Sequence, residues 1–420
     1  MTSRTAAAIA LLVLTAALVA VLALTTPWRP LAAPAGGRTA VDVSRDFTSA
    51  QVRREQSFHN ALRPAAFVRL GVGLGVALLL GLTPLGARLL GALARPLGNG
   101  WGWQVALGAL AVSVIGQLVT MPFAIYSEAV LRRYGLSTQD WAGWTLDLLK
   151  GLALGAGLSV AVLLGFIAVA RAAPRTWWAW TAAGAAALVF ALSFLYPVLV
   201  EPAFNKFAPM PQGQLRESLL ALAREDKVPV KQVLVADASR RTTSLNAYVS
   251  GFGSTRRIVV YDTLLKDAPP AEVRLVVAHE LGHAKRNDVL WGTLVGALGS
   301  AAACCLAYLL LGWPWLLHRA GVTGVQDGRS VALLLALVAL VGLLTLPVQS
   351  LVSRRIEARA DVHSLDLTHD PGTFIDSEKR LSVTNLSELS PSPIVYGLFF
   401  THPTGPERIA MARDWERLHP

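Results

Sequence analysis

Seven long apolar runs constrain this chain more than any other feature of its sequence. Each run approaches the roughly 20 residues that a helix needs to cross the hydrocarbon core of a bilayer. We expect membrane spans at about residues 6–26, 66–94, 101–125, 149–169, 177–199, 289–311 and 330–351, with a kink at Pro84 in the second. Only 15% of the residues are charged and 53% are hydrophobic, whereas about a quarter are charged in soluble domains. The sequence therefore predicts a mostly helical, multi-pass protein of the lipid bilayer.

The polar stretches between these runs divide the chain into four parts. Residues 1–200 are expected to form a membrane domain with five spans and their loops. Residues 201–288 carry the charges, turn residues and mixed periodicity of a water-facing α+β segment. Residues 289–353 supply two further spans, and residues 354–420 form a polar C-terminal segment. Within the water-facing segment, the pattern predicts a helix at 214–224 and strands at 233–236 and 257–261.

The formal net charge of +11 comes from arginines in short loops beside the spans. No basic run is interleaved with aromatic residues, so we expect no nucleic-acid partner. If the N-terminus lies outside, more of these arginines fall on the side of residues 201–288 than on the other. That side receives Arg29, Arg38, Arg45, Arg53, Arg54, Arg63, Arg132, Arg133, Arg354 and Arg355. The opposite side receives Arg88, Arg95, Arg171, Arg175, Arg319 and Arg329. Because basic residues favour the cytoplasmic side, we expect residues 201–288 in the cytoplasm.

A metal-binding pattern lies in the water-facing segment. Residues 279–283 read His-Glu-Leu-Gly-His, and in a helix positions four apart lie on one face, one turn apart. His279 and His283 can therefore bind one zinc ion, with Glu280 close enough to act as the general base of a metalloprotease.

A third ligand is required, because a catalytic zinc takes three protein ligands and leaves one position open. Glu357 follows the seventh span and can complete the coordination. Asp361 lies one helical turn further and can accept the ring N–H of a zinc-bound histidine, which would fix its tautomer. A solvated face paired with the nearby arginines is the alternative interpretation of these two acids. With the histidine motif, they predict one zinc ion per chain.

These motifs and their order resemble the type I CAAX prenyl endopeptidases, a family of integral membrane zinc proteases. The resemblance covers most of the chain. It rests on the number of spans, the His-Glu-x-x-His helix and the Glu357/Asp361 motif, and on the stretches 195–197, 201–207, 246–248, 257–265 and 402–408. It implies about seven helices that enclose a chamber, with a zincin-like catalytic domain on the cytoplasmic side.

The resemblance also implies roles for residues outside the metal motifs. Asn246 and Tyr248 would belong to an edge where a substrate peptide adds as a strand, and a loop asparagine in a turn is the alternative for Asn246. His402 would lie near the zinc and could hydrogen-bond a developing oxyanion. An ordinary surface histidine of the C-terminal tail is its alternative.

The sequence thus predicts a membrane zinc metalloendopeptidase similar to CAAX prenyl proteases. Its substrate would be a peptide or protein, with an isoprenylated or otherwise apolar C-terminus. A quality-control protease without a prenyl requirement stays open, because no residue specifically indicates isoprenoid binding. A transporter is disfavoured because the spans are nearly free of ionisable residues. Glu280 argues against a non-catalytic metal-binding receptor. A site-two-type protease would carry the motif within a span, whereas Arg274 and Lys285 flank it here.

Overall fold

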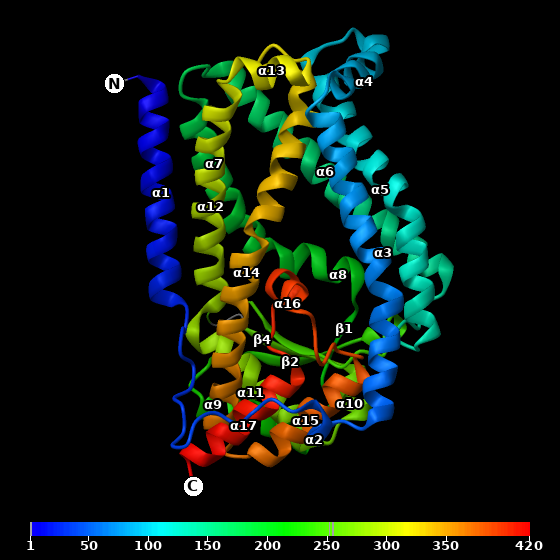
Figure 1. Ribbon diagram of the computed structural model, residues 1–420, viewed down its shortest axis with the longest axis vertical. Coiled ribbons are helices and arrows are strands. Elements are labelled where there is room, and N and C mark those ends of the chain that lie inside the picture. The colour runs from blue at the N-terminus through cyan, green and yellow to red at the C-terminus, as the bar shows by residue number, and fades with distance from the viewer. Residues whose placement is uncertain (1, 252, 254–255) are drawn as a thin grey trace.

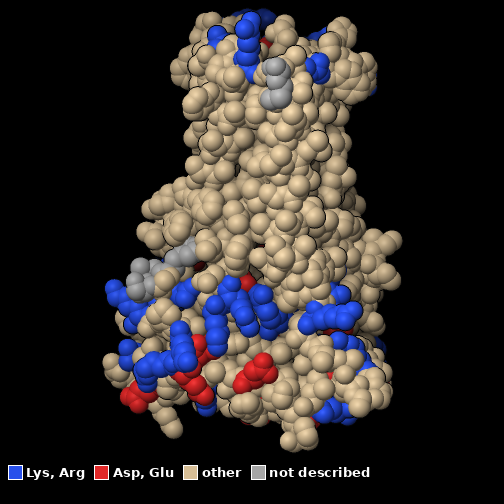
Figure 2. Space-filling model, turned by 90° about the vertical axis from the view of Figure 1, so that its left-hand side faces the viewer, with Lys and Arg blue, Asp and Glu red and all other residues tan. Residues whose placement is uncertain are grey.

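The computed structural model describes residues 2–251, 253 and 256–420. Long helices stand side by side through most of its height, and a small sheet with shorter helices closes one end (Figure 1). On the face drawn in Figure 2, charged side chains gather at the two ends and leave a band without charged side chains between them. This division matches a bilayer core flanked by two aqueous sides.

Among the described residues, seven helices are long and apolar enough to cross a membrane. They are Ser3–Thr25 (α1), Ser49–Gly81 (α3), Trp101–Arg133 (α5), Trp141–Ala172 (α6), Trp177–Phe204 (α7 with α8), Asp288–Leu311 (α12) and Gly328–Thr368 (with α14). The predicted number of spans and the mostly helical fold class are confirmed.

The expected second span, residues 66–94, was wrong in its bounds. Helix α3 begins earlier, at Ser49, where Thr48 and Gln51 form a reciprocal capping box. It ends at Gly81, and a separate helix, α4, covers Pro84–Ala94. Thr83 caps α4, and proline suits its first position because that residue needs no N–H partner there. A proline that suggested a kink within one span instead begins a new helix.

The aromatic-rich fifth span is interrupted near the end that lies toward the sheet. Helix α7 covers Trp177–Leu195 and is followed by a π-helical turn at Tyr196–Val200 and the short helix α8, Glu201–Phe204. Pro197 lies in the π turn, where it cannot donate a backbone hydrogen bond.

Shorter elements build the end of the molecule that carries the sheet. The helices are α2 (Val43–Asp46), α9 (Gln214–Glu225), α10 (Asp262–Asp267), α11 (Pro270–Arg286), α15 (Pro371–Thr384), α16 (Pro393–Phe399) and α17 (Gly405–Leu418). The strands are β1 (Phe207–Pro209), β2 (Gln232–Ala236), β3 (Ala247–Ser250) and β4 (Arg257–Tyr261). At the opposite end of the molecule, α13 (Pro314–Ala320) connects α12 to α14 (Val331–Thr368).

The sheet has the order β1-β2-β4-β3. Strands β2 and β4 are parallel, with Val233 opposite Ile258, while β1 and β3 are antiparallel to their neighbours. Val233, Ile258 and Val260 are buried on one face, in a core shared with α9 and α11. In this order strand β3 lies at an edge of the sheet. It packs against α11.

Helix α14 joins the membrane helices to the end that carries the sheet. Its first turns are buried among the membrane helices, where Val331 and Leu333 belong to the core. Its last turns pack against α11 and α17, where Leu365 is fully buried. The residues that follow the seventh span therefore continue the same helix, and α14 carries Glu357 and Asp361 to the end with the sheet.

Candidate metal centre

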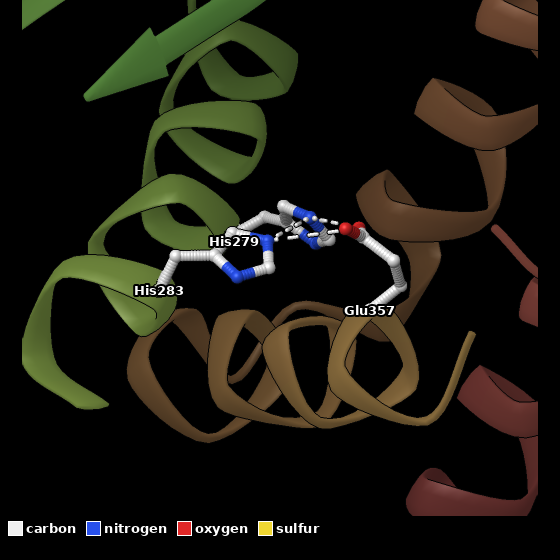
Figure 3. Close-up of side chains that lie close together, drawn as sticks. All are labelled: His279, His283 and Glu357. Carbon is white, nitrogen blue, oxygen red and sulfur yellow. Dashed lines mark hydrogen bonds and ion pairs between the residues drawn. The ribbon is translucent and has the colours of Figure 1, made fainter. Parts of the chain in front are cut away.

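Helix α11 presents both histidines of the predicted motif from one face. The helix begins at Pro270, after Pro269, and ends at Arg286; the next residue, Asn287, adopts a left-handed conformation with φ of 53°. Val277 and Leu281 are fully buried in the core beneath the sheet. Since this packing fixes the orientation of the helix, the imidazoles of the motif are directed toward α14 (Figure 3).

The third predicted ligand meets the two histidines across the gap between the helices. Nε2 of His279 lies 3.2 Å from Nε2 of His283 and 3.1 Å from Oε2 of Glu357. Nε2 of His283 lies 3.6 Å from the same carboxylate oxygen. Figure 3 shows the three side chains converging from α11 and α14. The structure thus brings together all three residues that the sequence predicted as metal ligands.

Each imidazole is hydrogen-bonded through Nδ1 to a carboxylate on the side of the ring opposite Nε2. Nδ1 of His279 lies 2.8 Å from Oδ1 of Asp361, and Nδ1 of His283 lies 2.9 Å from Oδ2 of Asp288. A carboxylate accepts the ring hydrogen at Nδ1, so each Nε2 faces the other with its lone pair. Two lone pairs at this separation repel unless a cation lies between them. The donor set therefore fits a metal ion, with one carboxylate and two neutral imidazoles as ligands.

The acids around the two imidazoles give the site a strong attraction for positive charge. Burial lowers the pKa of His279, but its hydrogen bonds to Asp361 and Glu357 outweigh burial and raise that pKa to about 10. For His283, burial is likewise outweighed, mainly by Asp288 and Glu357, and the pKa rises to about 9. A metal ion must therefore displace protons to bind here.

Two residues that support the ligands were not predicted from the sequence. Asp288 is the first residue of α12, and the chain reversal at Asn287 returns it to His283. Arg408 of α17 donates to both carboxylate oxygens of Asp361, with its Nε 2.8 Å from Oδ2. Arg408 also forms an ion pair of 2.7 Å with the buried Glu378. The spacing of five between His283 and Asp288 was the only local signal for either residue.

A cavity of about 800 Å³ opens at the metal centre. Its wall includes His279, Glu280, Asn246 and His402, together with Arg408. Burial raises the pKa of Glu280, and Glu357 adds to this, while the two neighbouring imidazoles oppose it when charged. A carboxylate with a raised pKa is well suited to exchange protons near neutral pH.

His402 lies at the rim of this cavity, where its side chain is 59% exposed. Its Nε2 is 3.2 Å from Oε2 of Glu357, on the carboxylate that faces the two ligand histidines. The structure thus brings His402 to the metal centre although it lies 45 positions after Glu357 in the sequence.

Asn246 and Tyr248 lie in different environments. Asn246 immediately precedes the edge strand β3 and lines the cavity. Tyr248 packs with Phe207 and Val259 on the sheet face opposite α11, and its hydroxyl donates to Oε2 of Glu201 at 3.4 Å. The structure therefore places Asn246 beside the metal centre and Tyr248 away from the cavity wall.

Two family models together match most of the chain. A model described as CAAX prenyl protease N-terminal, five membrane helices, matches residues 44–206, and one described as Peptidase family M48 matches residues 209–416. A CAAX prenyl protease 1 homolog from Arabidopsis thaliana is 30% identical over 306 residues, which are 70% of this chain and 69% of the relative. The chain belongs to peptidase family M48.

Further M48 relatives and a solved structure agree with this assignment. CAAX prenyl protease 1 of Saccharomyces cerevisiae is 27% identical over 319 residues, 71% of this chain and 69% of the relative. The Bacillus subtilis metalloprotease YhfN is 29% identical over 307 residues, 73% and 72% of the two chains. The crystal structure of S. mikatae Ste24p has the same fold, with a TM-score of 0.76, 20% identity, and coverage of 97% of this chain and 98% of that one.

The predicted family, fold class and enzyme class are therefore confirmed. This M48 chain is a multi-pass membrane metalloprotease of the CAAX-protease type, which requires a metal ion and acts on peptides or proteins. The predicted enclosure of a chamber by the seven helices stays a prediction, as does the division of the chain at residues 200, 288 and 353.

Proposed function

We propose that the chain is a zinc endopeptidase that hydrolyses peptides bearing an isoprenylated or otherwise apolar C-terminus at the cytoplasmic face of a membrane. The observation that carries this proposal is the convergence of His279, His283 and Glu357 on one point beside the cavity, whose wall includes His279 and Glu280. In a tetrahedral zinc site with bonds of about 2.0–2.1 Å, neighbouring ligand atoms lie roughly 3.3 Å apart. The separations of 3.1, 3.2 and 3.6 Å support zinc with this donor set.

The proposed roles of the residues follow from their positions. When bound, zinc would polarise the scissile carbonyl and lower the pKa of a water molecule toward neutrality. Glu280 would accept a proton from the attacking water and return it to the leaving amine. His402 would donate a hydrogen bond to the carbonyl oxygen as negative charge develops there. Asp361 and Asp288 would hold the ligand imidazoles in the tautomer that leaves Nε2 free.

The edge strand β3 supplies a place for the peptide backbone. The N–H of Tyr261 donates to the carbonyl oxygen of Asn246 at 3.0 Å, so Asn246 forms a hydrogen-bonded pair with β4. Because such pairs alternate with non-bonded ones along antiparallel strands, the backbone groups of Ala247 and Val249 point away from β4. A substrate could add there as a further strand, beginning beside the metal centre.

Charge distribution supports the cytoplasmic orientation. The arginines that flank the spans are more numerous at the end with the metal centre than at the end with α4 and α13. Since basic residues accumulate on the cytoplasmic side of a membrane protein, the metal centre would face the cytoplasm.

The apolar part of the cavity wall supports an apolar substrate. Leu62, Ala66, Phe67 and Leu70 contribute from α3, and Phe399 contributes from α16. Burying an isoprenoid or an aliphatic side chain against such a surface would stabilise the complex. A quality-control protease that takes unmodified apolar peptides is the second candidate, since the same wall would accept them.

A cleavage assay separates these two candidates. Purified protein in detergent is given one C-terminal Cys-x-x-x peptide with and without a farnesyl group, and the Glu280→Gln variant serves as the blank. Strong preference for the farnesylated peptide is the expected result. Equal cleavage of both forms, or cleavage of unrelated apolar peptides alone, would instead indicate the quality-control activity.

A further inference from the structure

Helix α16 lies beside α14 and close to the metal centre, and its sequence leads directly to His402 (Figure 1). Val395 and Phe399 of this helix, and Phe400 after it, line the cavity. The position of His402 therefore depends on how this short segment is held.

A helix as short as α16 cannot hold its own C-terminal end in place. The last four carbonyls of any helix have no partner within it, and α16 has only seven residues, Pro393–Phe399. In this structure, α14 supplies donors to three carbonyls at that end. Nη1 of Arg354 donates to the carbonyl oxygens of Tyr396 at 2.7 Å and Phe400 at 2.5 Å. Oγ of Ser350 donates to the carbonyl oxygen of Leu398 at 2.8 Å.

The charge and stacking of Arg354 reinforce this attachment. Its guanidinium lies 4.3 Å from the centre of the Tyr396 ring, in cation–π geometry. A positive charge at a helix C-terminus also interacts favourably with the carbonyl dipoles there. Arg354 is only 9% exposed, so these interactions form where water competes weakly.

The attachment shares a helix face with the metal ligand. Ser350, Arg354, Glu357 and Asp361 are spaced at 4, 3 and 4 residues along α14, so they form one stripe on that helix. Arg354 thus binds α16 from the turn of α14 that precedes Glu357. Beyond α16, Nε2 of His402 lies 3.2 Å from Oε2 of Glu357. The segment from α16 to His402 therefore contacts α14 at both ends, at Arg354 and at Glu357.

We propose that Arg354 is a positioning residue, which holds α16 and the following loop so that His402 stays at the metal centre. This inference rests on the proposed role of His402 in hydrolysis. Arg354 acts through the backbone of residues 396 and 400, not through substrate or metal. Removing its guanidinium should release the segment 393–402 while leaving the three metal ligands in place.

The test compares substitutions at two adjacent arginines of α14 in the full-length, zinc-loaded protein. Arg354→Met keeps an unbranched side chain without donors, and Arg354→Lys keeps the charge with a different geometry. Arg355→Met is the matched control, because Arg355 is the exposed neighbour on the same helix. Hydrogen exchange of residues 393–402, metal content, and kcat and KM are measured for each protein, and also for His402→Ala and for the double variant Arg354→Met with His402→Ala.

We expect Arg354→Met to accelerate exchange in residues 393–402 and to lower kcat about 100-fold, the size of losing one transition-state donor. Metal content should stay unchanged, and Arg354→Lys should fall between Arg354→Met and the unsubstituted protein. In the His402→Ala background, Arg354→Met should change kcat less than about threefold, because both changes remove the same interaction. Arg355→Met should behave like the unsubstituted protein.

Unchanged exchange in residues 393–402, or losses of kcat that multiply in the double variant, would overturn the proposal. If Arg354→Met does not fold, the same comparisons are made with Arg354→Lys. The exchange measurement does not require turnover. Should the unsubstituted protein cleave no peptide, the proposed function fails, and exchange alone decides whether Arg354 holds the segment.

Discussion

At the scale of single residues, the metal centre depends on how each ligand is held as well as on the ligands. His279 and His283 each place Nδ1 against a carboxylate, and those carboxylates are themselves bound by arginines: Arg408 for Asp361 and Arg359 for Asp288. Such outer contacts fix the orientation of the imidazole rings, and they keep the hydrogen on Nδ1 when a metal displaces the proton from Nε2.

The contact between His283 and Asp288 leads to a prediction about metal affinity. Asp288→Asn removes the charge that favours an Nδ1–H on His283, so we expect zinc affinity to fall about 10- to 100-fold. Competition with a chromophoric chelator measures this change. Asp366→Asn is the control, because Asp366 accepts a hydrogen bond from Trp415 on the same end of the molecule without contacting a ligand. Equal affinities of the two variants would contradict the role assigned to Asp288.

Local spacing explains which of these residues could be predicted. His279 with His283, and Glu357 with Asp361, are four apart on helices, so the sequence alone places each pair on one face. Asp288 escaped prediction because the helix breaks between it and His283, at Asn287. Arg408 escaped because only tertiary packing of α17 brings it to Asp361. Asn246 and His402 came from the family resemblance and not from spacing, and their functional roles stay predictions.

At the scale of elements, α3 and α14 approach closely near the end of α3, and both continue toward the end of the molecule with the metal centre. A Cβ added at Gly81 would lie 2.3 Å from Cβ of Ala336 and 2.6 Å from the carbonyl oxygen of Ala332. Small residues permit this crossing, as is common where helices meet within membranes. Nearer the metal centre, α3 contributes cavity wall, and α14 carries Glu357.

This crossing predicts that the same substitution at two glycines of α3 has different effects on stability. Gly81→Val forces the helices apart, and overpacking of this kind costs about 1–3 kcal/mol. We expect a lower apparent melting temperature in detergent for Gly81→Val than for Gly71→Val, because a Cβ at Gly71 meets nothing within 4 Å. Similar melting temperatures for the two variants would show that the crossing tolerates a larger separation.

The free edge of β3 gives a second prediction at this scale. Val249→Pro removes an N–H that points away from β4, so the sheet keeps its own hydrogen bonds while a bound peptide loses one. We expect KM to rise several-fold, with unchanged metal content, relative to Val249→Ala. The alanine variant controls for lost packing, since the Val249 side chain contacts the core beneath the sheet. An unchanged KM would indicate that peptides bind elsewhere.

The bounds of the helices and strands show which elements sequence patterns are sufficient to predict. The strand at 257–261 was predicted with its observed bounds, and the helix at 214–224 extends one residue further in the structure. Strand β1 was not predicted, and β3 was expected only from the edge that the family resemblance implied at Asn246 and Tyr248, because three or four residues show too little alternation to be recognised. Pro84 was read as a kink, since sequence alone does not reveal whether the chain continues in the same direction after a proline.

At the scale of the whole molecule, orientation in the membrane is the main consequence of the charge distribution. If the end with the metal centre faces the cytoplasm, the C-terminus after α17 lies there as well. In a bacterial host, a C-terminal green fluorescent protein fusion should be fluorescent, and the matching alkaline phosphatase fusion should be inactive. The reverse pattern would place the metal centre outside the cell and refute the orientation proposed from the arginines.

The central claim is that one metal ion, bound by His279, His283 and Glu357, works with Glu280 in peptide hydrolysis. The most direct measurement determines zinc content and cleavage rate together for the unsubstituted protein and for Glu280→Gln. Glutamine keeps the size of the side chain but cannot accept the proton of the attacking water. The account predicts one zinc per chain in both proteins, with hydrolysis lowered by at least about 100-fold in the variant. Full activity in Glu280→Gln, or hydrolysis by unsubstituted protein from which the metal has been removed, would contradict it.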